Sequence, residues 1–219
     1  MRVDHDYREA NAAAAAASSS GGGDGDDGAH TQRPLNPEQR RRALGSVLRE
    51  AQLAEAGMSK FFAAQQLLLR GRPDAAYFAE QERRQLDAVQ ELMPRYRTRP
   101  SLLLTLAQAA GAGAGALAAA APRRLWDAVV GGLQDALTEV YNEQLGELRR
   151  QGLSDDEPEV RRLVLALRDM ERAPEGAPAP PDVLALQRAE ALRGVGVAGV
   201  AGAVAKAAAL VLLGAGKRL

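Results

Sequence analysis

Apolar residues recur along this chain at the three- and four-residue spacing of helices, with polar residues between them. In the first such stretch, Leu44, Leu48 and Ala51 are followed at the same spacing by Met58 and Phe62. Ala, Leu, Arg, Glu and Gln, which favour helices, dominate the pattern, and β-branched residues are sparse. The sequence therefore predicts an all-α fold. Its helices are expected from Pro37 to Gly71, from Pro73 to a point before Pro100, from Ser101 to Ala121, from Pro122 to a point before Gly152, from Asp155 to about Arg172, and from Asp182 to Gly216, with a proline-rich break at Ala173–Asp182.

Two of these predicted helices carry almost no charge. The stretch Ser101–Ala121 has no charged residue, and Lys206 is the only one between Gly194 and Gly216. Their many Ala and Gly residues give less hydropathy than a clear transmembrane span has. We expect two additional apolar helices that contact a membrane or pack between other helices. Small residues at four-residue spacing, which allow close helix packing in either setting, are the pair Gly111 and Gly115 and the pair Gly199 and Ala203.

Residues 1–36 have a different composition from the rest of the chain. They contain an alanine run, a serine run and an Asp/Gly tract, which cannot bury a hydrophobic core. We expect a disordered low-complexity leader over 1–36 and one helical domain over 37–219. The acidic residues Asp4, Asp6 and Glu9 are unlike a mitochondrial presequence, which is poor in acids.

The charge balance and the lack of cysteine exclude several functions. The chain has 28 Lys and Arg against 28 Asp and Glu, so its formal net charge is zero and no nucleic-acid partner is expected. It has no cysteine, which excludes disulfides, thiolate metal ligands and a cysteine nucleophile.

Three glutamates fall on the apolar faces of separate predicted helices. Glu55 shares its face with Met58 and Phe62. Glu82 lies one turn from Phe78, and Glu171 lies one turn from Leu167. A buried carboxylate is costly unless it is paired or binds a metal. We therefore expect Glu55, Glu82 and Glu171 to converge around Gln134 in a four-helix bundle. The alternative is that these are ordinary amphipathic helices whose glutamates reach the edge of the apolar face.

Bundles that bind two irons take one Glu from each of two helices and a Glu-x-x-His pair from each of the other two. Here Glu82 is followed three residues later by Gln85, and Glu171 by Pro174. The only histidines, His5 and His30, lie in the leader. No imidazole is therefore available in the predicted bundle.

Several segments resemble the demethoxyubiquinone hydroxylase family, and they occur in the family's order from about Leu48 to the end. Glu80–Pro100, EQERRQLDAVQELMPRYRTRP, is similar to the family's first Glu-x-x-His helix and the Arg-x-Arg-Pro that follows it. Tyr141–Leu145 resembles its Tyr-Asn-Asn-Gln sequence, and Leu167–Glu171 its Phe-Arg-Asp-Glu-Glu run. The resemblance implies a ferritin-like four-helix bundle with a di-iron centre that hydroxylates a quinone precursor of ubiquinone.

Carried over position by position, the resemblance makes Glu55, Glu82 and Glu171 candidate metal ligands. Three further ligand positions have degenerated to Gln85, Gln134 and Pro174. An Arg-Val-Asp-His and Ala-Asn match near the N-terminus makes Glu9 a competitor for Glu55, and we prefer Glu55 because it lies on an amphipathic helix.

Three hypotheses follow. In the first, the chain is a ubiquinone-biosynthesis protein that binds a quinone-like lipid at a membrane surface, or assembles with other proteins of the pathway, with an impaired centre holding no metal or a single ion in place of iron. In the second it is an active hydroxylase with an unusual metal site. In the third it is an unrelated membrane-associated helical interaction protein. The resemblance implies a peripheral location on the matrix face of the mitochondrial inner membrane.

Overall fold

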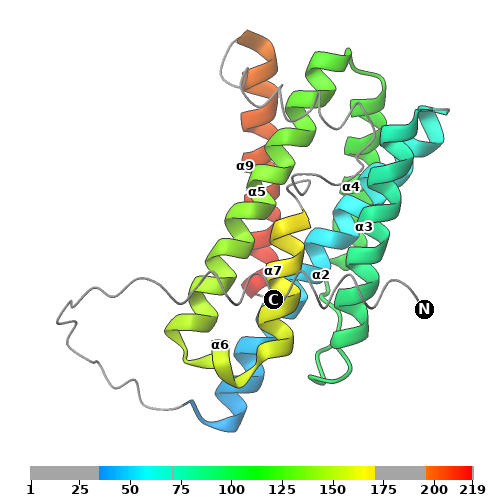
Figure 1. Cartoon of the computed structure of the whole chain (residues 1–219). Coiled ribbons are helices and arrows are strands. Elements are labelled where there is room, and N and C mark those ends of the chain that lie inside the picture. Colours follow the sequence, from blue (N-terminus) through cyan, green and yellow to red (C-terminus); the bar gives the residue numbers. More distant parts are fainter. Residues whose placement is uncertain (1–34, 71, 171–195, 219) are drawn as a thin grey trace, which may run out of the picture. The chain divides into compact units, whose positions relative to one another are not determined.

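The computed structural model describes residues 35–70, 72–170 and 196–218, and all regular structure in these ranges is helical. The all-α prediction is confirmed, and the predicted helix order is the observed one (Figure 1). The helices are α2 (Pro37–Leu68), α3 (Pro73–Leu92), α4 (Leu104–Ala119), α5 (Arg123–Arg150), α6 (Leu153–Asp156), α7 (Pro158–Met170) and α9 (Gly196–Arg218).

Local sequence explains where these helices begin and end. Asn36 caps α2, because its side chain accepts a hydrogen bond from the backbone N–H of Gln39 at 2.8 Å while the Gln39 side chain accepts from the N–H of Asn36. Pro73 occupies the first turn of α3, where its missing N–H is not needed. Gly152, with a φ of +69°, ends α5 and allows the chain to turn into α6.

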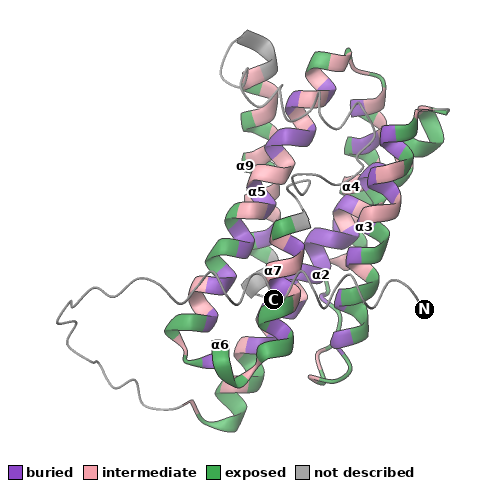
Figure 2. Cartoon of the chain, in the orientation of Figure 1, coloured by how far each residue is buried: buried purple, intermediate pink, exposed green. Residues whose placement is uncertain are grey.

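The core lies where α2, α3, α5 and α7 face one another. Helix α2 packs on α3, α5 packs on α7, and α7 also contacts α2 and α3. The apolar faces of these helices are buried, as the purple segments of Figure 2 show. The stacked rings of Phe62 and Phe78, with centroids 4.9 Å apart, join α2 to α3. The largest fully buried apolar side chains are Leu48, Leu53, Phe61, Phe62, Trp126, Tyr141, Leu148 and Leu167.

The two Ala- and Gly-rich helices, α4 and α9, lie against this core along glycine contacts. A Cβ added to Gly111 of α4 would stand 2.1 Å from the carbonyl oxygen of Gly57, so α4 packs on the bare backbone of α2. Helix α9 approaches α5 in the same way, where a Cβ on Gly132 would stand 2.2 Å from the oxygen of Gly202. The prediction that small residues allow close helix packing is therefore confirmed for Gly111 of α4. On α9 the closest contact is made by Gly202, whereas Ala203, which the spacing favoured, is exposed.

The outer faces of α4 and α9 carry exposed apolar side chains. No helix in the described ranges is long and apolar enough to cross a membrane. Contact of these two helices with a membrane surface stays a prediction. Large exposed apolar residues in and beside them are Leu102, Leu106, Leu117, Val200, Val204 and Val211.

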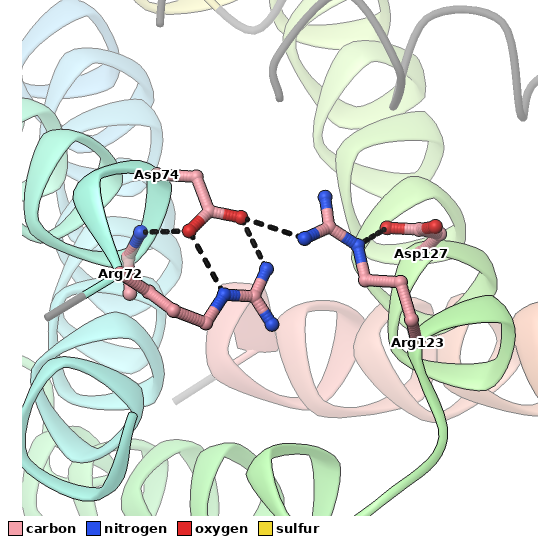
Figure 3. Close-up of polar contacts among 5 residues, drawn as sticks. Arg72, Asp74, Arg123 and Asp127 are labelled. Atoms are coloured by element: carbon pink, nitrogen blue, oxygen red, sulfur yellow. Dashed lines mark hydrogen bonds and ion pairs between the residues drawn. The ribbon is translucent and has the colours of Figure 1, made fainter. Parts of the chain in front are cut away.

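A charged network joins the beginnings of α3 and α5 (Figure 3). Asp74, which has no exposed surface, accepts hydrogen bonds from Arg72 and, at 3.1 Å, from Arg123 of α5. Arg123 also pairs with Asp127 at 2.8 Å, and both guanidinium groups lie within 5 Å of the Trp126 ring centroid, at 4.9 and 4.7 Å. Burial by itself would raise the pKa of Asp74, but its bonds to Arg72 and the charge of Arg123 hold that pKa below its usual value.

Several predictions lie outside the described residues. They are the disorder of the leader, the role of Glu9, the proline-rich break, the beginning of the last helix at Asp182, and the positions of Glu171 and Pro174.

Candidate carboxylate centre

The centre of the helical core contains two glutamates from different helices. Glu55 of α2 and Glu82 of α3 are both fully buried, and their side chains lie in hydrogen-bonding contact. They meet because the Phe62–Phe78 stack holds α2 and α3 together, and each glutamate lies one or two turns from its Phe on the same face. The predicted convergence is therefore confirmed for this pair.

Tyr141 of α5 fixes the orientation of Glu55. Its hydroxyl donates a hydrogen bond to Oε1 of Glu55, and the tyrosine ring is fully buried. Burial raises the pKa of Glu55 from 4.5 to about 7, while the hydrogen bonds to Tyr141 and Glu82 act in the opposite direction. The Glu55 carboxyl is thus partly protonated at neutral pH, and a shared proton can join it to Glu82.

Gln85 lies one turn after Glu82, at the position where the family places a histidine. Its side chain is fully buried, and neither amide atom has a hydrogen-bond partner among the described residues. An amide buried in this way loses its hydrogen bonds to water without replacement, which is costly. The side chain is therefore suited to a ligand or a water molecule beside Glu82.

Gln134 does not join this pair by any hydrogen bond in the described part of the chain. It is half-buried on α5, on the same face as Tyr141 but about two turns away. Its neighbour Asp135 acts electrostatically on Lys206 of α9, which also forms an ion pair with Glu139 at 2.8 Å. Asp135 therefore faces α9 and does not replace the missing ligand.

A second buried polar pair lies next to the carboxylates and was missed from the sequence. Gln144 of α5 donates a hydrogen bond from Nε2 to Oε2 of Glu50 at 3.0 Å, and both side chains are buried. Gln144 and Tyr141 are three residues apart, so α5 contacts α2 through two successive polar layers. The spacing of Tyr141 and Gln144 was the signal available, but nothing in the sequence marked Glu50 as buried.

An apolar cavity of about 380 Å³ lies beside the carboxylate centre, between α2, α4, α5 and α9. Ala54 and Leu137 belong to its wall, next to Glu55 and one turn from Tyr141 respectively. Leu106, Ala110 and Ala208 line the cavity and are exposed, so it opens between α4 and α9. Helices α4 and α9 thus cover this space.

A helical core with carboxylates from separate helices at its centre is the architecture of ferritin-like carboxylate bundles. The family model described as "Ubiquinone biosynthesis protein COQ7" matches residues 42–177, more than half of the 219-residue chain. The chain belongs to this family, which is the demethoxyubiquinone hydroxylase family that the sequence resembles, and it has a role in ubiquinone biosynthesis. Comparison with individual curated proteins gives no match. The hypothesis of an unrelated helical protein is therefore wrong.

The residues of this chain do not fit the two-iron ligand set of the family. Glu55 and Glu82 fit two carboxylate positions, but the amide of Gln85 replaces an imidazole, and an amide nitrogen is a poor iron ligand. The sequence has no histidine after His30, and proline at position 174 cannot coordinate. In residues 35–70, 72–170 and 196–218, no three His, Cys, Asp or Glu side chains form a metal-binding group.

Proposed function

We propose that this chain binds a quinone precursor of ubiquinone at a membrane surface, without the two-iron oxygen activation of its family. The observation that carries the proposal is the apolar cavity beside the carboxylate centre. A quinone with an isoprenoid tail needs an apolar site for the tail and polar groups for the ring oxygens. The cavity lining is suited to the tail. Its wall includes Ala54, the neighbour of Glu55, and Leu137, one turn from Tyr141.

The opening of the cavity supports delivery of the ligand from a bilayer. It lies between α4 and α9, whose outer faces carry exposed apolar residues such as Leu102, 85% exposed, and Leu117, 77% exposed. Arg97 and Arg99 before α4, and Arg124 after it, are exposed and can contact lipid phosphates. Arg123, in contrast, forms ion pairs with Asp74 and Asp127. By family resemblance, we propose the matrix face of the mitochondrial inner membrane as the location, and assembly with other ubiquinone-biosynthesis proteins stays a prediction.

Two neighbouring alanines of α4 provide the binding test. Ala110 lines the cavity, whereas Ala109 is equally exposed but does not line it. Equilibrium dialysis of the full-length protein against a short-tailed demethoxyubiquinone is expected to show about one ligand per chain. The A110W side chain should occupy the opening and weaken binding by roughly tenfold or more, since it displaces apolar contacts. The control A109W should bind like the wild type. Equal affinities for both variants would contradict the cavity as the site.

The membrane part of the proposal is tested separately by flotation with anionic, quinone-containing vesicles. Full-length protein is expected to float, and L102E and L117E on the α4 side should reduce the floating fraction, because a charge there is costly in the interface. Leu67, 64% exposed at the end of α2, provides the control, and L67E should float like the wild type. Wild-type protein that stays with the soluble fraction would remove the membrane proposal while leaving the cavity test intact.

A further inference from the structure

The degenerate centre keeps a set of oxygen donors that are not suited to redox iron but suit another class of metal. We propose that Glu55, Glu82 and the amide oxygen of Gln85 form a mononuclear site for one hard divalent cation of the Mn²⁺ or Mg²⁺ class. This proposal goes beyond quinone binding and does not depend on it.

The first argument is the arrangement of the donors. Glu82 and Gln85 are three residues apart on the buried face of α3, and Glu55 reaches Glu82 from α2. All three side chains are fully buried. Carboxylate and amide oxygens are the ligands that Mg²⁺, Ca²⁺ and Mn²⁺ prefer.

The second argument is the state of Gln85, which is independent of the two acids. Its Oε1 and Nε2 are buried and have no hydrogen-bond partner among the described residues. If Gln85 had replaced histidine only to fill space, an apolar side chain would serve better, because it would leave no polar atom unsatisfied. A cation held by Oε1 would satisfy the acceptor and explain a polar residue here.

The orientation of Glu55 and the negative charge of the two buried carboxylates also support a cation site. Tyr141 donates to Oε1 of Glu55, while Oε2 is buried and accepts no hydrogen bond from a donor group in the described ranges. Tyr141 is therefore a positioning residue that holds Oε1 and leaves Oε2 for another partner, as hydrogen bonds to metal-binding carboxylates commonly do. One divalent cation would neutralise both carboxylates, which lowers the cost of burying them.

The test is a titration of EDTA-treated, full-length protein with Mn²⁺, in which electron paramagnetic resonance measures the concentration of free Mn²⁺. One saturable Mn²⁺ per chain is expected, and Q85L should weaken binding by at least tenfold. Gln65 of α2 offers a matched control, since it is also fully buried with both amide atoms unpartnered in the described ranges, but lies about three turns from Glu55. Q65L should leave Mn²⁺ affinity unchanged.

A second variant keeps the proposal falsifiable if Q85L does not fold. Q85H replaces the amide oxygen by an imidazole nitrogen and should shift the preference of the site from Mn²⁺ toward Zn²⁺ or Co²⁺ by roughly tenfold or more. No saturable Mn²⁺ binding by folded wild type would overturn the proposal, as would equal Mn²⁺ affinities for wild type and folded Q85L. Neither result would affect the cavity test, which measures quinone binding by equilibrium dialysis without added metal.

Discussion

Replacing Glu55 by glutamine should change how the stability of this protein depends on pH. Glutamine has nearly the same shape as a protonated glutamate, can accept the Tyr141 hydrogen bond through its oxygen, and can donate to Glu82 through its amide. Unlike Glu55, it cannot ionise. The E55Q variant therefore reproduces the protonated form of the centre at every pH.

The size of the effect follows from the pKa of Glu55. Burial raises that pKa from 4.5 to about 7 in the folded protein. Between these values the folded state holds a proton that the unfolded state has released, so the stability contributed by the protonated carboxyl is fully present below pH 4.5 and is lost as the pH rises through 7. A pKa difference of this size corresponds to about 3 kcal/mol. In E55Q this loss should be absent.

Urea unfolding of EDTA-treated protein at several pH values measures the difference. The free energy of unfolding of E55Q relative to wild type should increase by about 3 kcal/mol from pH 4.5 to pH 8 and then stay constant. E91Q, which changes an exposed carboxylate of α3, is the control and should follow the wild-type curve closely. If the E55Q and wild-type curves run parallel over this pH range, the buried carboxyl pair is not as described. With saturating Mn²⁺ at pH 8, the free energy of unfolding should instead be larger for the wild type than for E55Q, because the cation stabilises only the wild type.

Further substitutions test the glycine packing, the charged network and the Tyr141 hydrogen bond. In urea unfolding, G111A should lower the free energy of unfolding by about 2 kcal/mol, because its Cβ would stand 2.1 Å from a carbonyl oxygen of α2. G113A is the control: a Cβ there would meet no atom within 4 Å, so it should raise the free energy of unfolding by about 0.5 kcal/mol. D74N should lower the free energy of unfolding by roughly 2 kcal/mol at pH 7, since Asp74 is buried between two partly exposed arginines. The difference from the wild type should shrink as the pH falls below 3.8, because wild-type Asp74 then becomes protonated. Y141F should cost about 1 kcal/mol and raise the pKa of Glu55 further, which nuclear magnetic resonance of the labelled carboxyl would detect.

Helical periodicity and turn residues were enough to predict the helices and part of the centre. The spacing of Leu44, Leu48 and Ala51 marks the buried face of α2, and Glu55 and Glu82 lie on such faces, so their meeting follows from helix packing. The prediction was weaker at Gln134, because a helical face is broad and a residue two turns from the contact can lie at its edge.

Other features depend on contacts between distant segments, which local sequence does not encode. Asp74 follows a proline at the beginning of a helix, where an acid is ordinarily exposed, but in the fold it is buried against Arg72 and against Arg123, which comes from α5. Glu50 follows Arg49 and resembles a solvated charge until Gln144 meets it across the core. The cavity arises from how α4 and α9 lie on glycine contacts, and a pattern of single residues does not reveal such a space.

We propose that a quinone site persists in this member of the family while two-iron oxygen activation does not. The most direct measurement is mass spectrometry of the quinone recovered from full-length protein after incubation with short-tailed demethoxyubiquinone, Fe²⁺, a reductant and oxygen. About one quinone per chain, with its ring unchanged, should be recovered. Recovery of the hydroxylated quinone would show that oxygen activation persists, and recovery of protein without bound quinone would show that the quinone site is absent.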